Sequence, residues 1–335
     1  MKQALKILKA IVVFLFCSLL GLILHGWSAL AIFYCSFPAH PQLRMPAAIL
    51  YLLAVLAVVL FNRKHTRAFF LTLLGFVLVA IWFSSIQPKT GGVYPPELAL
   101  PNVDFNGDQV TVHNVRNSNY RTPTDFDVRY ETRTYNLSDL KTLDIMVNYW
   151  GMDAIAHTFL SFGFTGDRYL TVSVEIRPEV GKTYDMLQGF FKQYQLIYIW
   201  ADDRDLIRLR TNYKKENVYL YRSTLTPEEV RKLLVSMLKA TDGIYYKPVW
   251  YNTLTHSCTN TLGNHVIETG IRKIPIWKRR FLTGDVDQRL YKAGLLDNSL
   301  PFPELRKRAN IDARAIAADK DPDFSKKIRT HLIAQ

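Results

Sequence analysis

The sequence predicts an α+β protein in which three membrane-spanning helices precede one exported domain of mixed strands and helices. Charge is distributed unevenly along the 335 residues: the first 90 contain eight Lys or Arg and no Asp or Glu. The remaining residues carry 34 basic and 29 acidic side chains, an ordinary balance for a soluble domain. The net charge of +13 is therefore in part a membrane signature, and the length suggests about two units.

Three long apolar runs, at about residues 11–33, 46–61 and 68–86, fill most of the first segment. The first run exceeds the roughly 20 residues that a helix needs to cross a bilayer. It has no small-residue cleavage site, so it should remain in the protein. The alternative is a helical hairpin buried in a soluble core, but no nearby segment is amphipathic enough to cover it. Residues 1–87 are therefore expected to form a membrane domain.

Loop charges predict how these spans are oriented. Three lysines precede the first run and three cations lie between the second and third runs. The first loop holds only Arg44, and only Lys89 lies just after the third run. Because cytoplasmic loops are rich in Lys and Arg, the N-terminus should be cytoplasmic and the chain after about Gln87 periplasmic. The expected location is a bacterial inner membrane, with an exported domain at residues 88–300 and a charged C-terminal tail at 301–335.

The exported segment alternates strand and helix patterns. Strand-like stretches occur at about residues 107–115, 124–137, 195–200 and 217–223, with a short strand that ends near Trp150. Residues 203–213 are expected to be helical. A further helix should begin after Thr226, because Pro227 suits the first helical position and Glu229 completes a capping box.

Two alternating stretches on either side of residues 165–167 predict a β-hairpin. An odd loop centred on Gly166 matches the polar faces of the two strands and pairs residues whose numbers sum to 332. His157 then lies opposite Glu175, with Cβ atoms about 4.5–5.5 Å apart. The carboxylate can orient the imidazole as a general base requires. The alternative interpretation is a half-buried salt bridge on a sheet face.

Cys258 has no cysteine partner in the exported domain, because Cys17 lies within the first apolar run and Cys35 near its end. Its neighbours, "THSCTN", are rich in hydroxyl and amide groups, and a helical pattern follows that ends near Gly270. A helix N-terminus favours thiolate over thiol and can help to bind an oxyanion. Cys258 is therefore a candidate nucleophile with His157 as its base; a buried small hydrophobe is the alternative.

Other chemistry finds little support in the sequence. His256 and His265 lie two and seven residues from Cys258, where local geometry should direct them elsewhere. No spacing is typical of a metal site and no glycine-rich loop suits a phosphate, so no metal, cofactor or nucleic-acid partner is expected. The segment 272–282, "RKIPIWKRRFL", mixes five cations with apolar side chains, which favours contact with an anionic membrane surface. A solvated loop is its alternative.

Five segments carry a resemblance to a known family: "VTVHNVRNSNYRTPTDF", "YWGMDAIAHTFLSFGF", "VSVEIRPEVGKTYD", "LIRLRTNY" and "WYNTLTHSCTN". In this order they resemble the exported domain of the Lnb-type bacterial lipoprotein N-acyltransferases, over about residues 108–296. The resemblance implies a permuted papain-like (NlpC-type) fold in which Cys258 is the nucleophile, His157 its base and Glu175 the third member. It also implies that an acyl chain passes from a phospholipid, through a cysteine thioester, to the α-amine of a diacylglyceryl-cysteine lipoprotein.

Two other classes of function remain open at this point. A periplasmic cysteine peptidase or amidase acting on peptidoglycan would use the same residues, but it needs a wide polar cleft and attacks amides. A non-enzymatic membrane scaffold would not need Cys258.

Overall fold

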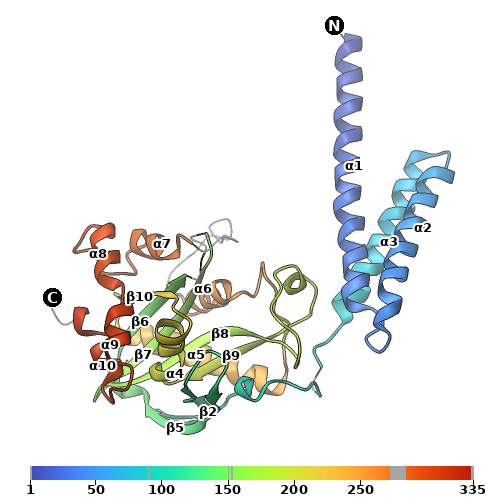
Figure 1. The fold of residues 1–335 in the computed structure, drawn as a ribbon. Helices are drawn as coiled ribbons and strands as arrows, with labels where there is room; N and C mark the ends of the chain where they lie inside the picture. The colour runs from blue at the N-terminus through green and yellow to red at the C-terminus, as the bar shows by residue number, and fades with distance from the viewer. Residues whose placement is uncertain (1, 90, 150, 152–153, 272–283, 333–335) are drawn as a thin grey trace. The chain divides into compact units, whose positions relative to one another are not determined.

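The computed structural model describes residues 2–89, 91–149, 151, 154–271 and 284–332, and the chain forms two compact units (Figure 1). The first, called the helical unit below, comprises Met1–Pro88 and Asp185–Gln193. The second, called the sheet unit, comprises Lys89–Tyr184 and Tyr194–Gln335.

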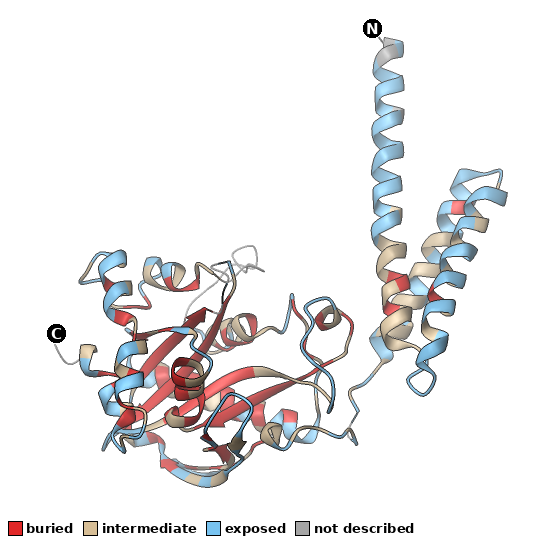
Figure 2. Ribbon diagram, viewed as in Figure 1, coloured by how far each residue is buried: buried red, intermediate tan, exposed pale blue. Residues whose placement is uncertain are grey.

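Three long helices make up most of the helical unit: α1 Lys2–Cys35, α2 Arg44–Phe61 and α3 His65–Ser85. All three are long and apolar enough to cross a membrane, as the three apolar runs predict. Their apolar side chains lie largely on the outside, where Figure 2 shows mostly exposed surface. Such an exposed apolar surface is typical of helices that face lipid.

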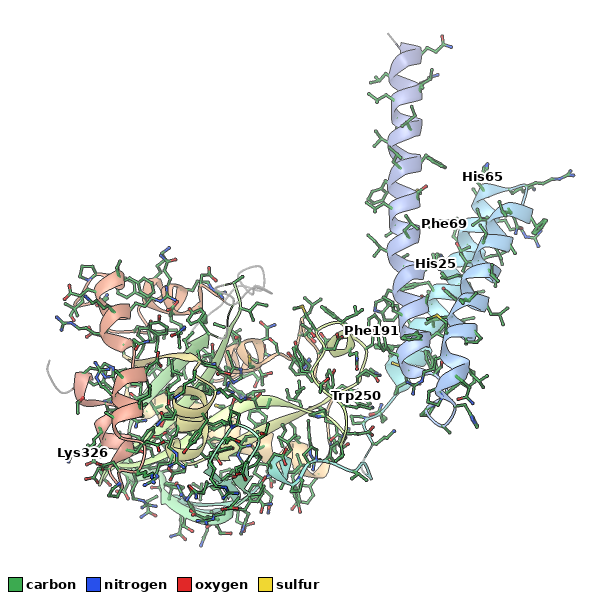
Figure 3. All side chains as sticks on the ribbon, in the orientation of Figure 1. His25, His65, Phe69, Phe191, Trp250 and Lys326 are labelled. Atoms are coloured by element: carbon green, nitrogen blue, oxygen red, sulfur yellow. The ribbon has the colours of Figure 1, made fainter. Side chains whose placement is uncertain are left out.

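The segment Asp185–Gln193 packs on these helices although it is distant from them in the sequence (Figure 3). The ring of Phe191 stacks on Tyr34, with 5.3 Å between centroids, and meets Phe83 edge-on at 6.4 Å. The Lys192 ammonium donates to the carbonyl oxygens of Phe83 at 2.6 Å and Ile86 at 3.0 Å, so it binds the carbonyl groups at the end of α3. Aromatic contacts and a helix cap therefore hold this segment in the helical unit.

An eight-stranded sheet forms the centre of the sheet unit, in the order β1-β2-β9-β8-β7-β6-β10, with β5 paired to β2. Its strands are β1 Asn102–Asn106, β2 Gln109–Arg116, β5 Tyr130–Asn136, β6 Leu140–Tyr149, β7 Ala156–Phe164, β8 Arg168–Arg177, β9 Gln195–Ala201 and β10 Asn217–Arg222. The short strands β3 Asn119–Tyr120 and β4 Phe126–Asp127 pair separately. Pairing is antiparallel except between β2 and β9. The unit is thus mixed α and β, as predicted.

The β7–β8 hairpin has the predicted register. Leu160 pairs with Val172 and Phe164 with Arg168, so the residue numbers of each pair sum to 332. This register follows from the odd number of loop residues, because only an odd loop aligns the polar faces of the two strands.

Beyond these pairs the two strands of the hairpin follow different neighbours. β7 continues on β6 as far as Ala156, and β8 continues on β9 as far as Arg177. Helix α6, Cys258–Glu268, packs against both β7 and β8. The hairpin therefore brings its open end, which carries His157 and Glu175, to the helix that begins with the thiol.

Helices cover both faces of the sheet. Helix α5, Pro227–Tyr246, has the predicted capping box, and with α6 it packs on the face to which Leu160 points. Helix α4, Asp203–Arg208, continues as the π-helix Leu209–Tyr213 and packs on the other face, to which Phe159 points. Because adjacent strand residues point to opposite faces, Phe159 and Leu160 belong to separate clusters of buried side chains.

The segment from Pro301 on, expected to be a charged tail, contains helices that belong to the sheet unit. They are α8 Phe302–Ala309, α9 Asp312–Ala317 and α10 Phe324–Lys327. Ala315 and Phe324 are fully buried and pack with Phe159 of β7. Each helix is too short to give a visible apolar period, which is why composition alone suggested a tail.

Candidate active site

Cys258 is the first residue of α6, so the thiol lies at a helix N-terminus as predicted. Ser257 is the N-cap, and its hydroxyl accepts from the backbone N–H of Asn260. The Asn260 side chain donates to the carbonyl oxygen of Leu254 at 2.6 Å and fixes the preceding loop. Capping and loop together place the half-buried thiol at the positive end of the helix dipole.

His157 lies beside the thiol on β7 and is 5% exposed. Its Nε2 is 2.7 Å from Ser173 Oγ and 3.1 Å from Glu175 Oε1. The ring also shares a hydrogen bond with the Cys258 side chain. Since Nε2 contacts both the serine and the carboxylate, these two groups fix the orientation of the ring.

The charges of the pair stabilise one another. Burial lowers the pKa of His157, but the charges of Glu175 and the Cys258 sulfur raise it to about 9. Burial raises the pKa of Cys258, but the imidazolium and the backbone N–H of Thr158 lower it below its ordinary value. The paired charges therefore favour the thiolate–imidazolium form of the site over the neutral thiol and imidazole.

Glu175 is held by three donors on a single oxygen. Its Oε1 accepts from Ser173 Oγ at 2.7 Å and from Arg210 Nη2 at 2.9 Å, in addition to His157. Burial raises the pKa of this carboxyl, and His157 and Arg210 lower it far below its usual range. The carboxylate is ionised and fixed, as a group that orients an imidazole must be.

A second layer of polar side chains surrounds Glu175. Arg210 Nη1 donates to Glu216 Oε2 at 3.1 Å, and the Asn148 amide donates to the same oxygen at 2.5 Å. The guanidinium carbon of Arg210 lies 5.4 Å from the Phe159 ring centroid. No sequence pattern predicted a role for Arg210, Glu216 or Asn148. Arg210 falls within the segment "LIRLRTNY", which is part of the resemblance to the Lnb-type family.

Tyr251 is a further neighbour of the thiol that the sequence did not indicate. Burial raises the pKa of its phenol, and the charges of Tyr184 and Cys258 raise it further. A side-chain hydrogen bond joins Tyr251 to Tyr184. The backbone N–H of Tyr251 donates to the carbonyl oxygen of Tyr194 at 2.9 Å, which fixes the loop before Cys258.

The two competing histidines have other partners. His265 Nε2 is 2.7 Å from Tyr198 Oη and its Nδ1 is 2.8 Å from Ser236 Oγ. Burial lowers the pKa of His265 to about 4, so it is neutral. His256 Nδ1 is 2.8 Å from Thr255 Oγ1. The geometry thus places His157, and neither of these, beside sulfur.

Within the described part of the chain, no group of three or more His, Cys, Asp or Glu side chains could hold a metal ion. The described cysteines are all free thiols. The basic segment 272–282, expected to contact a membrane surface, lies outside the described residues.

Fold and site together define a membrane protein with three apolar helices and an α+β domain that carries a Cys–His–Glu cluster around a buried histidine. Residues 126–279, which include all three cluster members, match the family model of the Lnb N-terminal periplasmic domain. The match confirms the resemblance to the Lnb-type family and supports a periplasmic location for the C-terminal domain. No curated protein and no solved structure matches the chain.

Proposed function

We propose that the protein is a lipoprotein N-acyltransferase that carries an acyl chain on Cys258. It takes the chain from a membrane phospholipid and gives it to the α-amine of a diacylglyceryl-cysteine lipoprotein. The observation that carries the proposal is the cluster at the start of α6, in which the buried His157 contacts both Cys258 and Glu175. The match to the Lnb N-terminal periplasmic domain and the three apolar helices favour a lipid substrate.

The first half-reaction forms the thioester. The Cys258 thiolate attacks the ester carbonyl carbon, and the N–H groups at the start of α6 stabilise the oxyanion that develops. The carbon–oxygen bond then breaks, and the lysophospholipid leaves as an alcohol after the His157 imidazolium donates its proton. His157 is left neutral, with Glu175 still holding its Nε2–H.

The second half-reaction returns the site to its starting state. The lipoprotein amine attacks the thioester carbonyl, and neutral His157 accepts the proton that the amine loses. The carbon–sulfur bond breaks, the amide product leaves and the Cys258 thiolate again faces an imidazolium. Tethering to the membrane supplies proximity, since both substrates lie at the membrane surface.

The fold proposed for this chemistry is a permuted papain-like (NlpC-type) domain. His157 on β7 and Glu175 on β8 precede Cys258 in the chain, the reverse of the Cys, His, Asn order of papain-like enzymes. A thiol that begins a helix packed on the strands of its base supports this assignment. The catalytic roles are inferred from geometry and do not depend on the permutation.

We also propose that the N-terminus is cytoplasmic and that the chain after residue 90 is periplasmic. Loop cations support this orientation. A reporter that is active only outside the cytoplasm should be active when fused after Thr90 and inactive when fused near His65. The reverse pattern would place Cys258 in the cytoplasm and remove the case for lipoprotein substrates.

Mass spectrometry of lipoprotein N-termini tests the activity in cells. A strain that depends on this protein should make N-acylated lipoproteins with the wild-type chain and diacyl, free-amine lipoproteins with Cys258→Ala. Unchanged lipoproteins together with altered peptidoglycan amide bonds would instead favour a cysteine amidase. No change in either would favour a scaffold.

A further inference from the structure

Arg210 occupies an unusual turn beside the site. Helix α4 widens at Leu209–Tyr213 into a π-helix, a distortion that is frequent at functional sites. Arg208, two residues earlier, donates to the carbonyl oxygens of Arg204 and Asp319, away from the cluster. The two arginines of this helical segment therefore have different hydrogen-bond partners, and only Arg210 of the two donates to Glu175.

The Arg210 guanidinium is bound on three sides. One terminal nitrogen donates to Glu175 and the other to Glu216, while the planar group lies over Phe159. A side chain that is 11% exposed and bridges two carboxylates in this way has one available orientation. Lysine has a single nitrogen and no planar face, so it could not reproduce both the bridge and the stacking.

We propose that Arg210 is a positioning residue that fixes Glu175 against His157, with Glu216 and Asn148 as its own supports. The inference deepens the proposed function and rests on it for the catalytic meaning of the cluster. Its physical basis is that Glu175 Oε1 serves Arg210, Ser173 and His157 at once. Removing the guanidinium frees the carboxylate to turn away from the imidazole.

Several charged groups act on this part of the site. Burial and the positive charge of Arg210 lower the pKa of His157, whereas the negative charges of Glu175 and the Cys258 sulfur raise it. Glu175 also faces Lys214 and Tyr251. Loss of Arg210 can therefore act in two opposite ways: losing its repulsion would stabilise the imidazolium, whereas losing the position of Glu175 would destabilise it.

The sign of one pH shift separates these effects. The full-length protein in detergent is alkylated with iodoacetamide across a pH series, and the Cys258 peptide is followed by mass because Cys17 and Cys35 also react. A thiolate held by an imidazolium reacts at a pH well below the ordinary thiol pKa. Arg210→Gln should move the half-maximal pH upward, as Glu175→Gln does, and a shift of about one unit should slow alkylation roughly tenfold at pH values well below the wild-type midpoint.

Three comparisons make the test decisive. Arg208→Gln, the matched control, should leave the pH profile of the folded protein unchanged. The double variant Arg210→Gln/Glu175→Gln should be no slower than Glu175→Gln alone, since Arg210 acts through Glu175. Arg210→Lys should recover part of the rate without restoring the wild-type midpoint.

A downward shift, or an unchanged midpoint in folded Arg210→Gln, would overturn the proposal. If the Arg210 variants do not fold, Glu216→Gln replaces them, and an unchanged midpoint there overturns it equally. Alkylation reports the thiolate whatever the substrate is. A protein that shows the upward shift yet transfers no acyl chain would thus contradict the proposed activity and leave the positioning role intact.

Discussion

Removing the guanidinium of Arg329 tests whether the C-terminal helices are part of the folded sheet unit. Arg329 is 3% exposed and donates to Asp144 at 2.6 Å, to Asp203 at 2.7 Å and to Ser161 at 2.9 Å. In Arg329→Met an apolar chain keeps much of the volume, but two buried carboxylates lose their shared cation. Asp144 retains Arg222 at 2.5 Å, whereas among the described residues Asp203 is left with neutral donors.

The size of the effect follows from this burial. Removing one partner of a buried ion pair costs about 3–5 kcal/mol. Because each kcal/mol moves the Tm of a unit of this size by about 2–4 °C, Arg329→Met should unfold roughly 6–20 °C below wild type at neutral pH. Burial raises the pKa of Asp203, but Arg329 lowers it below the ordinary 3.8. Its stabilising contribution is complete above that value and is lost as pH falls through the lower folded pKa, so the difference should shrink only under acid conditions.

Thermal unfolding of the full-length protein in detergent measures the shift. Lys326→Met is the matched control, because Lys326 lies on α10, three residues before Arg329, but is exposed and 3.6 Å from its partner Asp167. It should change stability by about 0.5 kcal/mol or less. Equal midpoints for Arg329→Met and wild type would refute the assignment of these helices to the fold.

Three further predictions concern the cap, the carboxylate and the helical unit. Ser257→Ala removes the N-cap of α6 and should lower thermal stability by about 1 kcal/mol. The control is Thr255→Ala, at an exposed residue; loss of stability in this variant and not in Ser257→Ala would contradict the assignment of Ser257 as the N-cap. Glu175→Gln should move the midpoint of Cys258 alkylation upward toward the ordinary thiol pKa of 9.0, because His157 then loses the charge that raises its pKa; a downward shift would show that the carboxylate opposes the ion pair. Phe191→Ala empties a buried aromatic site and should lower the free energy of unfolding by about 3–5 kcal/mol. The loss should be seen as faster proteolysis within 185–193, while the variant Leu187→Ala, at an exposed residue, should be cleaved like wild type.

Short-range patterns in the sequence predict much of the site. The parity of the 165–167 loop fixed which residues face one another, so the neighbourhood of His157 and Glu175 followed from alternation alone. The capping and turn residues around Cys258 likewise located the start of α6. Both signals depend on residues that are close in the chain.

The parts that could not be predicted depend on contacts between distant residues. Ser173 stood on the predicted polar face, but its position between His157 and Glu175 depends on side-chain rotamers. Arg210 reaches Glu175 only because α4 packs on the sheet and widens at the π-turn. The polar face of the hairpin is buried around Ser161, since Arg329 of the unpredicted C-terminal segment contacts it there.

The most direct test of the account is the covalent intermediate on Cys258. Purified full-length protein is given phospholipid and no lipoprotein acceptor, and the Cys258 peptide is examined by mass spectrometry. We predict an added acyl chain on Cys258 that hydroxylamine removes at neutral pH. Added lipoprotein should take up this chain as an N-acyl product, and the His157→Ala variant should form the adduct far more slowly. Full acyl transfer by Cys258→Ala, or an acyl chain that resists hydroxylamine, would contradict it.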